Sequence, residues 1–384
     1  MNVHQPPSLG WCTGHPVLGN WGWAGGPAAR YRPRVWYKRG HVPLASLAMT
    51  TLLVTAVLVF AASWAGSGLM TSWLRRRMIL DHPVERSSHA RPVPKGCGVA
   101  VTAVLLLGWL DLALAGLAPP ETLLACCLAF ALAALSWFND VTDLPAALRL
   151  AVHLLIAAVG LLALPDRGHV FQGLLPEDLD QAATVLLWAW FMNLFNFMDG
   201  IDGITAVETS AIGFGLAFVG ALTGIASGGY LLLVVALAAA ALGFLPWNWH
   251  PARVFLGDVG SVPLGFAAGW LLLLLASRGY WASALLLPLY YLADATLTLL
   301  LRVARGEAVW RAHKTHFYQR ALAPDGDHGA VALWILAGNL GLAAAAVMAV
   351  WHPESALALG AAITTALLLK LALRGRRAPR PASA

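Results

Sequence analysis

The chain contains a short polar motif that could bind a phosphate group or a metal ion. The stretch NLFNFMDGIDGI, residues 193–204, carries two amides and two carboxylates in a largely apolar chain. In a helix, a three-residue spacing places Asn193, Asn196 and Asp199 on one face, before the glycines end the helix. Asp202 follows three residues later and would repel Asp199 unless a cation or a donor lies near. The alternative is that these residues only end a helix and form a turn.

A second motif, VFLGDVGSVPLGF, places Asp258 between Gly257 and Gly260. Mg²⁺ usually takes one or two carboxylates from a protein and completes its shell with water and substrate phosphates. Backbone N–H groups at the start of a helix can bind phosphate oxygens. We therefore predict that Asp258 binds a divalent cation at the start of an apolar helix. In the alternative, Ser261 is simply the N-cap of that helix.

A third motif, WRAHKTHFYQR, combines two imidazoles with three cationic side chains. The three-residue spacing predicts that His313 and His316 share one helical face. Arg311, Lys314 and Arg320 lie around them in the sequence. Such donors suit a diphosphate, whereas zinc is disfavoured because no further Cys or His follows at ligand spacing. A solvated basic loop is the alternative.

Two further motifs carry charged residues next to apolar segments. In SWFNDVTDLPAALRL, Asp140 and Asp143 follow one apolar segment. In DHPVERSSHARPVPKGCG, Lys95 is one of several cations in a proline-rich stretch. Taken alone, this last motif also fits the ordinary excess of positive charge beside a membrane span.

Hydropathy identifies the elements that must position these motifs. Hydrophobic residues make up 59% of the 384 residues and charged residues only 11%, against about 25% in a typical soluble domain. Uniformly apolar runs of about 18 or more residues recur throughout, which predicts transmembrane helices rather than the alternating strands of a barrel. We expect an all-α, polytopic integral membrane protein with about 11 transmembrane helices. The predicted spans are roughly 43–66, 97–117, 121–138, 147–164, 182–198, 204–224, 229–245, 261–277, 281–301, 331–351 and 354–373.

The distribution of positive charge predicts the orientation in the membrane. Of the 25 lysines and arginines, only Arg167 and Arg278 lie in loops after even-numbered spans, and five precede the first span. Cytoplasmic loops collect lysine and arginine, so the loops after odd-numbered spans should be cytoplasmic, although the five N-terminal charges oppose this. All the motifs above lie on that side. We therefore predict a single active site on the cytoplasmic face, assembled from several loops.

The predicted spans divide the chain into three parts. Residues 1–42 are rich in Gly, Pro and Trp, lack periodicity, and are expected to be a disordered N-terminal extension. Residues 43–374 form the transmembrane domain, and residues 375–384 form a basic cytoplasmic tail. The four cysteines do not show the spacing of a disulfide framework.

The five motifs, in their order along the chain, resemble the signature set of the polyprenyl-phosphate N-acetylhexosamine-1-phosphate transferases of glycosyltransferase family 4. This superfamily also contains the MurNAc-pentapeptide translocase, and the resemblance covers roughly residues 45–370. It implies an enzyme of the bacterial inner membrane that transfers an N-acetylamino-sugar 1-phosphate from a UDP-sugar to undecaprenyl phosphate and releases UMP. It also implies dependence on Mg²⁺ or Mn²⁺.

The resemblance implies a role for each matching position. It implies catalytic roles for Asp140, Asp199, Asp202, Asp258, His313 and His316, substrate-binding roles for Asn193, Asn196, Gly257, Arg311, Arg320 and Lys95, and metal-ligand roles for Asp258 and Asp199. The family usually shows two adjacent aspartates where this chain has Asn139 and Asp140, and an amide carries no charge. We predict that Asp140 suffices. Substitution by Asp143, or a slow enzyme, are the alternatives.

Other functions compete with this interpretation. The spaced histidines resemble enzymes that initiate O-antigen and capsule synthesis, and transfer of phospho-MurNAc-pentapeptide in peptidoglycan synthesis is the alternative. A transporter of a phosphorylated substrate would place its acids near the bilayer midplane and within repeats, whereas the acids here gather at one end. A scaffold with an inactive site is supported only by Asn139. The expected partners are the UDP-sugar, undecaprenyl phosphate and the lipid bilayer, with a homodimer allowed and no nucleic acid.

Overall fold

The computed structural model describes residues 44–83, 91–142, 144–164, 169–225, 229–308, 313–322 and 326–376. All of them belong to one compact unit, His41–Ala384. The predicted N-terminal extension, residues 1–42, lies outside the described residues, and so do residues 377–384 of the predicted tail. Arg311 and Asp143, which the sequence singled out, also lie outside them.

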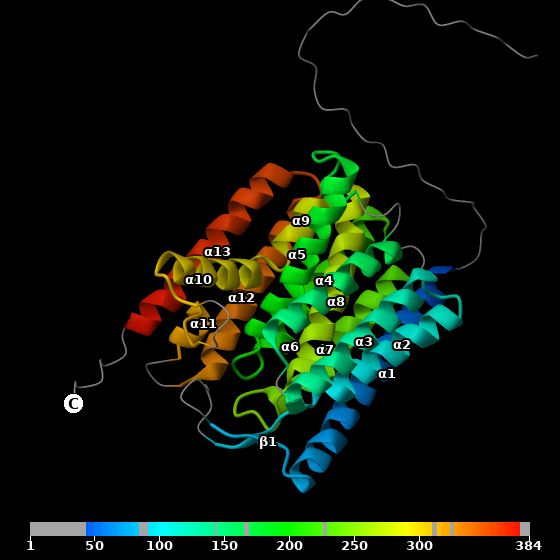
Figure 1. Cartoon of the computed structure of the whole chain (residues 1–384). Helices are drawn as coiled ribbons and strands as arrows, with labels where there is room; N and C mark the ends of the chain where they lie inside the picture. The colour runs from blue at the N-terminus through cyan, green and yellow to red at the C-terminus, as the bar shows by residue number, and fades with distance from the viewer. Residues whose placement is uncertain are drawn as a thin grey trace, which may run out of the picture. The chain divides into compact units, whose positions relative to one another are not determined.

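The described residues form an all-α membrane protein, as hydropathy predicts (Figure 1). Two short strands, β1 (Leu80–Asp81) and β2 (Val93–Pro94), pair antiparallel. The helices are α1 (Leu44–Arg76), α2 (Gly98–Leu114), α3 (Glu121–Thr142), α4 (Ala146–Gly160), α5 (Glu177–Phe197), α6 (Ile204–Thr223), α7 (Tyr230–Asn248), α8 (Asp258–Leu275), α9 (Trp281–Leu286), α10 (Leu289–Ala304), α11 (Phe317–Arg320), α12 (His328–Met348) and α13 (Pro353–Arg376). Eight helical segments of the described chain are long and apolar enough to cross a membrane, and α2 is a shorter apolar helix.

Each predicted span coincides with helical structure, but two of them differ from the prediction in extent. α1 continues to Arg76, well beyond the predicted end. The ninth span, predicted as one helix over 281–301, consists of α9 and α10, which are separated at Leu287 and Pro288. Proline lacks an N–H and its ring clashes with the carbonyl four residues earlier, so the prediction of one continuous helix is wrong. The total of about 11 spans stays a prediction.

Nearly all of α8 is buried, and Asp258 is its one residue outside the buried set. The helix contacts α2, α3, α5 and α6. Glycines let these neighbours approach closely, since Gly265 lies against Phe195 of α5 and Gly260 lies against Gly98 at the start of α2. Small residues at helix interfaces are typical of membrane proteins, because they allow backbones to pack closely. α2 and α5 are therefore held against α8, the helix that begins with Asp258.

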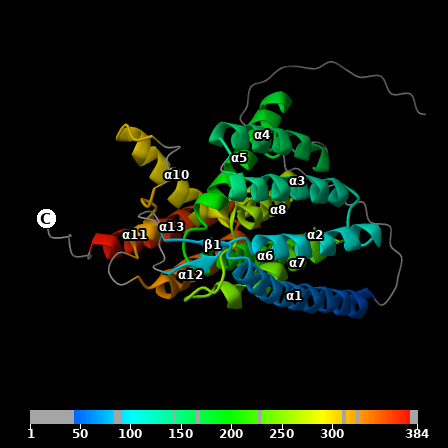
Figure 2. The same ribbon diagram turned by 60° about the horizontal axis from the view of Figure 1, so that its bottom comes forward.

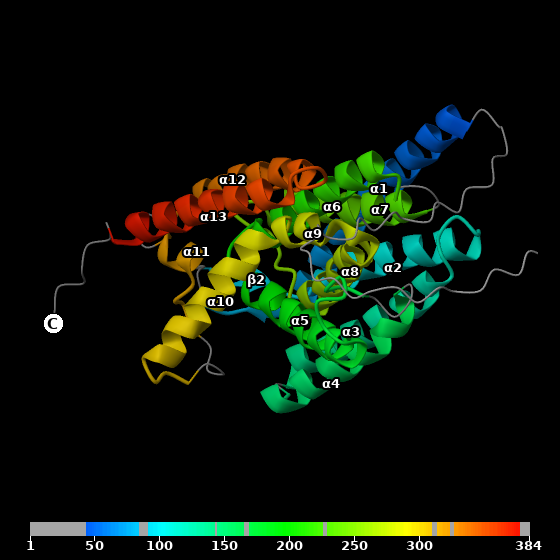
Figure 3. The same ribbon diagram turned by 90° about the horizontal axis from the view of Figure 1, so that it is seen from above.

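α10 diverges from the other long helices, as Figures 2 and 3 show. It contacts α5, α11, α12 and α13. Its buried residues include Tyr290, Asp294, Thr298 and Arg302, which recur every four residues and therefore share one face of the helix. This polar face of α10 meets the segment that contains His316.

Replacing Gly98 by alanine should lower the thermal stability of the protein. A Cβ at this position would overlap the backbone of Gly260 in α8, and overpacking of a close contact typically costs about 1–3 kcal/mol. Gly108→Ala is the matched control, because its Cβ would lie at an ordinary 3.5 Å from a methyl group of Val59. The measurement is thermal unfolding of both purified variants in the same detergent. Equal melting temperatures would contradict this account of the contact between α2 and α8.

Candidate active site

Asp258, the first residue of α8, follows a turn that is paired with a distant segment of the chain. Phe255 donates its N–H to the carbonyl of Pro94 (2.8 Å), and Gly98 donates its N–H to the carbonyl of Leu256 (2.8 Å). The backbone N–H groups of one segment are thus satisfied by the carbonyls of the other. This pairing brings the KGCG stretch, which precedes α2, beside the turn that carries Asp258.

Gly257 allows a second carboxylate to approach the start of α8. Its φ is 77°, a conformation that glycine adopts without the strain that a Cβ would cause. A Cβ there would lie 3.2 Å from a carboxylate oxygen of Asp140, at the end of α3. Asp140 also accepts a long hydrogen bond from the N–H of Val259 (3.4 Å). The positive φ and the nearby Asp140 carboxylate therefore explain why position 257 is a glycine. The predicted role of Gly257 in substrate binding stays a prediction.

Donors and cations surround Asp258 and Asp140. Nδ2 of Asn139 donates to Oδ2 of Asp258 (2.8 Å), and an amine of Arg149 lies 3.6 Å from the same oxygen. The ammonium of Lys95 lies 2.8 Å from Oδ1 of Asp140. Burial alone would lower the pKa of Lys95, but the charges of Asp258 and Asp140 raise it well above its ordinary value. Lys95 is therefore charged at neutral pH, and it offsets the negative charge of the two carboxylates.

Asp199 belongs to the same electrostatic cluster. It lies just beyond the end of α5 and accepts a hydrogen bond from the hydroxyl of Thr205 (2.6 Å). Burial raises the pKa of Asp199 to about 7, with a further contribution from the charge of Asp258, while Thr205 and Lys95 oppose the shift. Three carboxylates, Asp140, Asp199 and Asp258, thus influence one another at one end of the helices. A cation bound among them would favour ionisation of Asp199.

The two asparagines of the α5 motif are used in different ways. The hydroxyl of Ser261 donates to Oδ1 of Asn196 (2.7 Å), which joins α5 to the first turn of α8. Asn193 donates to the carbonyl of Ala189 in its own helix (2.7 Å). The alternative reading of Ser261 as an N-cap is wrong, because α8 begins three residues earlier, at Asp258. The hydroxyl of Ser261 connects α5 to α8 and does not cap the N-terminus of α8.

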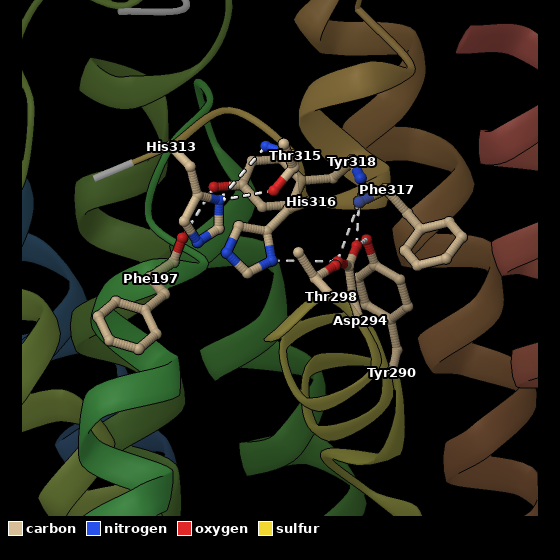
Figure 4. Close-up of polar contacts among 9 residues, drawn as sticks. All are labelled: Phe197, Tyr290, Asp294, Thr298, His313, Thr315, His316, Phe317 and Tyr318. Carbon is tan, nitrogen blue, oxygen red and sulfur yellow. Dashed lines mark hydrogen bonds and ion pairs between the residues drawn. The ribbon is translucent and has the colours of Figure 1, made fainter. Parts of the chain in front are cut away.

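The histidine motif reaches the end of α5 through α11. The hydroxyl of Tyr318 donates to the carbonyl of Phe197 (2.9 Å), and His316 contacts Asp294 of α10 (Figure 4). Residues 313–316 precede α11 and are not helical, so the prediction that the two histidines share a helical face is wrong. The rings of His313 and His316 nevertheless stack, with centroids 4.9 Å apart and planes at 28°.

Arg320 lies apart from the carboxylate cluster. It is exposed and lines a small cavity of about 140 Å³ together with Arg302 and Arg305. The hydroxyl-bearing residues Thr298 and Thr315 line the same cavity. If Arg320 binds the substrate as predicted, it does so in this cavity. Its role in substrate binding stays a prediction.

Asp202 forms a separate cluster with two imidazoles. Nδ1 of His250 lies 2.7 Å from one carboxylate oxygen, and Nδ1 of His328 lies 3.1 Å from the other. The N–H of Ala252 also donates to the carboxylate (3.0 Å). Burial alone would raise the pKa of Asp202, but hydrogen bonds and charge from His328 and His250 lower it below its ordinary value. Asp199 and Asp202, three residues apart in the sequence, thus have different partners.

The Asp202 cluster has the composition of a metal site, because one ligand atom from each of its three residues lies within 4.8 Å of the others. One carboxylate oxygen, however, already accepts from the N–H of Ala252 and faces Nδ1 of His250, and the N–H of Asp202 itself donates to Nδ1 of His328 (3.2 Å). The cluster connects the loop before α6, the loop after α7 and the start of α12. We interpret it as a brace between these segments, and the predicted catalytic role of Asp202 stays a prediction.

The comparison with known families agrees with this arrangement. A model of the family described as Glycosyl transferase family 4 matches residues 122–276 of the chain. The matched stretch runs from α3 through α8 and includes Asp140, Asp199 and Asp258. Residues 122–276 of this chain therefore form a glycosyl transferase family 4 region. This match supports the family resemblance that the motifs indicate, while the subgroup stays a prediction.

Individual members of family 4 align over different parts of the chain. The probable undecaprenyl-phosphate N-acetylglucosaminyl 1-phosphate transferase of Bacillus subtilis is 28% identical over 71% of this chain and 78% of its own length. The decaprenyl-phosphate N-acetylglucosaminephosphotransferase of Mycolicibacterium smegmatis is 28% identical over 88% of this chain and 91% of its own. The phospho-N-acetylmuramoyl-pentapeptide-transferase of Moorella thermoacetica is 43% identical, over 23% of this chain and 27% of its own.

Sequence reasoning gave no role to several residues that build this family 4 site. Thr205 contacts Asp199 across a turn, and His250 and His328 contact a residue distant in the sequence; periodicity carries no information about such contacts. Asp294 is different, because an acidic residue within an apolar segment is itself a sign of function. That signal was available in the sequence, but it does not connect Asp294 to the histidines.

Replacing Asp202 by asparagine should destabilise the family 4 fold. The change removes the charge that faces His250 and His328, and a hydrogen bond to a charged group contributes about 1.5–3 kcal/mol. Asp111→Asn is the matched control, because Asp111 is exposed near the far end of α2. Thermal unfolding in detergent should show a lower melting temperature for the Asp202 variant alone. A melting temperature equal to that of the control would rule out a brace.

Proposed function

We propose that the protein transfers an N-acetylamino-sugar 1-phosphate from a UDP-sugar to a polyprenyl phosphate and releases UMP. The observation that carries this proposal is the cluster of three carboxylates, Asp140, Asp199 and Asp258, with the charged Lys95 beside it. Such a set of charges suits a diphosphate held with a divalent cation. The relatives that align over most of the chain carry names of this reaction class, which supports the proposal.

The proposed reaction exchanges one phosphoanhydride for another. An oxygen of the lipid phosphate attacks the β-phosphorus of the UDP-sugar and forms a new P–O bond. The bond between the β-phosphorus and the bridging oxygen breaks, and UMP leaves with that oxygen. The lipid phosphate is already ionised near neutral pH, so catalysis requires positioning and charge neutralisation more than a strong base.

The carboxylate cluster has the chemistry of a Mg²⁺ or Mn²⁺ site. Carboxylate oxygens are the ligands that these ions prefer, and the three carboxylates of the cluster face two cations, Lys95 and Arg149. Asp258 and Asp199 would hold the ion, which when bound supplies charge neutralisation for the diphosphate. Lys95 and the imidazole N–H groups of His313 and His316 would bind the remaining phosphate oxygens and orient them.

A largely apolar cavity supports a lipid acceptor. It has a volume of about 280 Å³ and lies between α5, α8, α9 and the start of α10, with aromatic walls from Trp188, Phe191 and Trp281. The lining residue of α5 nearest to its carboxylate end is Phe191, eight residues before Asp199. An isoprenoid chain could pack in this cavity with its phosphate directed toward that end of α5.

Within this reaction class we favour initiation of a surface polysaccharide such as O-antigen or capsule. Relatives named for N-acetylglucosamine transfer align over most of the chain, whereas relatives named for MurNAc-pentapeptide transfer align over 23% to 36% of it. His313 and His316 are also separated by two residues rather than adjacent. A cytoplasmic site in the bacterial inner membrane fits the charge distribution.

Purified protein should release UMP from a UDP-N-acetylamino sugar only when polyprenyl phosphate and Mg²⁺ are both present. Asp258→Ala should reduce this rate by about 100-fold or more, because it removes charge stabilisation at the reacting phosphates. Asp111→Ala is the control for loss of an aspartate elsewhere. Full activity of Asp258→Ala would remove the metal assignment, and flux of substrate without UMP would indicate transport. Parallel assays with UDP-GlcNAc, UDP-QuiNAc, UDP-FucNAc and UDP-MurNAc-pentapeptide identify the sugar.

Restoring the acidic pair with Asn139→Asp should change turnover by less than about tenfold, whereas gain of a required general base would raise it by about 10²–10⁴-fold. In the wild type Asn139 donates to Asp258 and accepts from the N–H of Leu144 (3.1 Å). The added carboxylate would face Asp258, so the Mg²⁺ concentration for half-maximal rate should fall. Titration of UMP release with Mg²⁺ measures both quantities. A thousandfold gain would show that Asn139 impairs the natural protein.

A further inference from the structure

Asp294 is a fully buried carboxylate in α10. Burial of an ionised carboxylate is costly unless donors and counter-charges surround it, and ionisable residues within membrane helices mark functional sites by default. Asp294 lies outside the cluster formed by Asp140, Asp199 and Asp258. The presence of this buried carboxylate in α10 therefore requires a separate explanation.

Five donors converge on the Asp294 carboxylate, as Figure 4 shows. Two come from its own helix: the hydroxyls of Tyr290 (3.1 Å) and Thr298 (3.3 Å). The other three come from the histidine motif itself: Nδ1 of His316 (3.2 Å), the N–H of Phe317 (3.0 Å) and the N–H of Tyr318 (3.1 Å). Asp294 therefore holds one end of α11 and the ring of His316 in a fixed relation.

The contact with Asp294 decides which nitrogen of His316 carries the proton. An ionised carboxylate only accepts hydrogen bonds, so Nδ1 of His316 is the donor and Nε2 is turned away from Asp294. His313 has the opposite arrangement, because its Nδ1 lies 3.4 Å from the N–H of Thr315 and accepts from it. Burial, with the neighbouring His316 and Arg302, lowers the pKa of His313 to about 4, so its neutral ring offers an N–H at Nε2. Stacking thus places the His313 ring, with its N–H at Nε2, beside the ring of His316.

The segment held by Asp294 also contacts the loop that carries Asp199. The hydroxyl of Tyr318 donates to the carbonyl of Phe197, the last residue of α5. Tyr318 also packs against Gly200, where a Cβ would overlap its hydroxyl. A displacement at Asp294 would therefore be transmitted both to the His316 ring and to the edge of the carboxylate cluster.

We propose that Asp294 is a positioning residue for phosphoryl transfer: it accepts from Nδ1 of His316 and fixes the orientation of the ring, so that the N–H at Nε2 of the protonated imidazole is directed at a phosphate oxygen. This inference rests on the proposed function, since the phosphate belongs to the UDP-sugar or the polyprenyl phosphate. The arrangement follows the general rule that an imidazole is oriented by the hydrogen bond of its second nitrogen. Asp294 itself does not touch the substrate.

The test is a double-mutant cycle on UMP release in detergent. Asp294→Asn keeps the size of the side chain but removes its charge and one acceptor oxygen. It should lower kcat by about 10–100-fold, as loss of an orienting partner does, with KM for the UDP-sugar changed by less than about threefold. His316→Gln should have a similar effect. The double variant should be no slower than His316→Gln alone, because the two residues act as a unit.

Tyr290→Phe is the matched control, because it removes one neutral donor from the Asp294 carboxylate and leaves His316 in place. It should keep kcat within about threefold of the wild type. Thermal unfolding of every variant identifies a loss caused by misfolding. Should Asp294→Asn fail to fold, Asp294→Glu displaces the same carboxylate by one methylene. It must then lower kcat in the wild-type background and leave kcat unchanged in the His316→Gln background.

Two results would overturn the role of Asp294. One is an unchanged kcat in a folded Asp294 variant, and the other is a further loss of about tenfold or more when the variant is combined with His316→Gln. Either result with an active wild type refutes this inference alone. A wild-type protein that releases no UMP from any UDP-sugar refutes the proposed function and the inference with it.

Discussion

A buried carboxylate among apolar helices costs free energy unless hydrogen-bond donors or cations surround it. This requirement determines which loops come together at the polar end of the helices. Asp258, Asp202 and Asp294 are each surrounded by donors from two or more segments of the chain. The contacts that offset the cost of burying each charge therefore also connect segments that are distant in the sequence. Loops that would otherwise be independent form one assembly around the buried helix α8.

The three carboxylate centres differ in how completely they are satisfied. Asp294 accepts donors at both oxygens, Asp202 faces an imidazole nitrogen at each oxygen, and both residues join segments of the fold. In the third centre, the carboxylates Asp140, Asp199 and Asp258 are matched by two cations, Lys95 and Arg149, and burial raises the pKa of Asp199. An incompletely compensated cluster beside fully compensated ones is the arrangement expected of a site that takes up a cation and a phosphorylated ligand.

Much of the fold could be predicted from the sequence, because hydropathy alone marks membrane helices and one-sided charge marks their shared end. Helical periodicity placed Asn193 and Asn196 correctly on α5, but it could not follow the chain beyond the end of that helix. Asp199 and Asp202 therefore separate into two clusters that spacing could not distinguish. The break at Pro288 could have been predicted from the proline itself, whereas the link from Asp294 to the histidine motif depends on tertiary contacts, which no local pattern encodes.

The close packing of Tyr318 on Gly200 has a consequence for the history of the chain. Any side chain at position 200 would occupy the space of the tyrosine hydroxyl, which also satisfies the last carbonyl of α5. A substitution at one of these two positions is tolerable only together with a compensating one at the other. Among related chains the two positions should therefore change as a pair, although Gly200 lies in the loop after α5 and Tyr318 lies far along the sequence in α11.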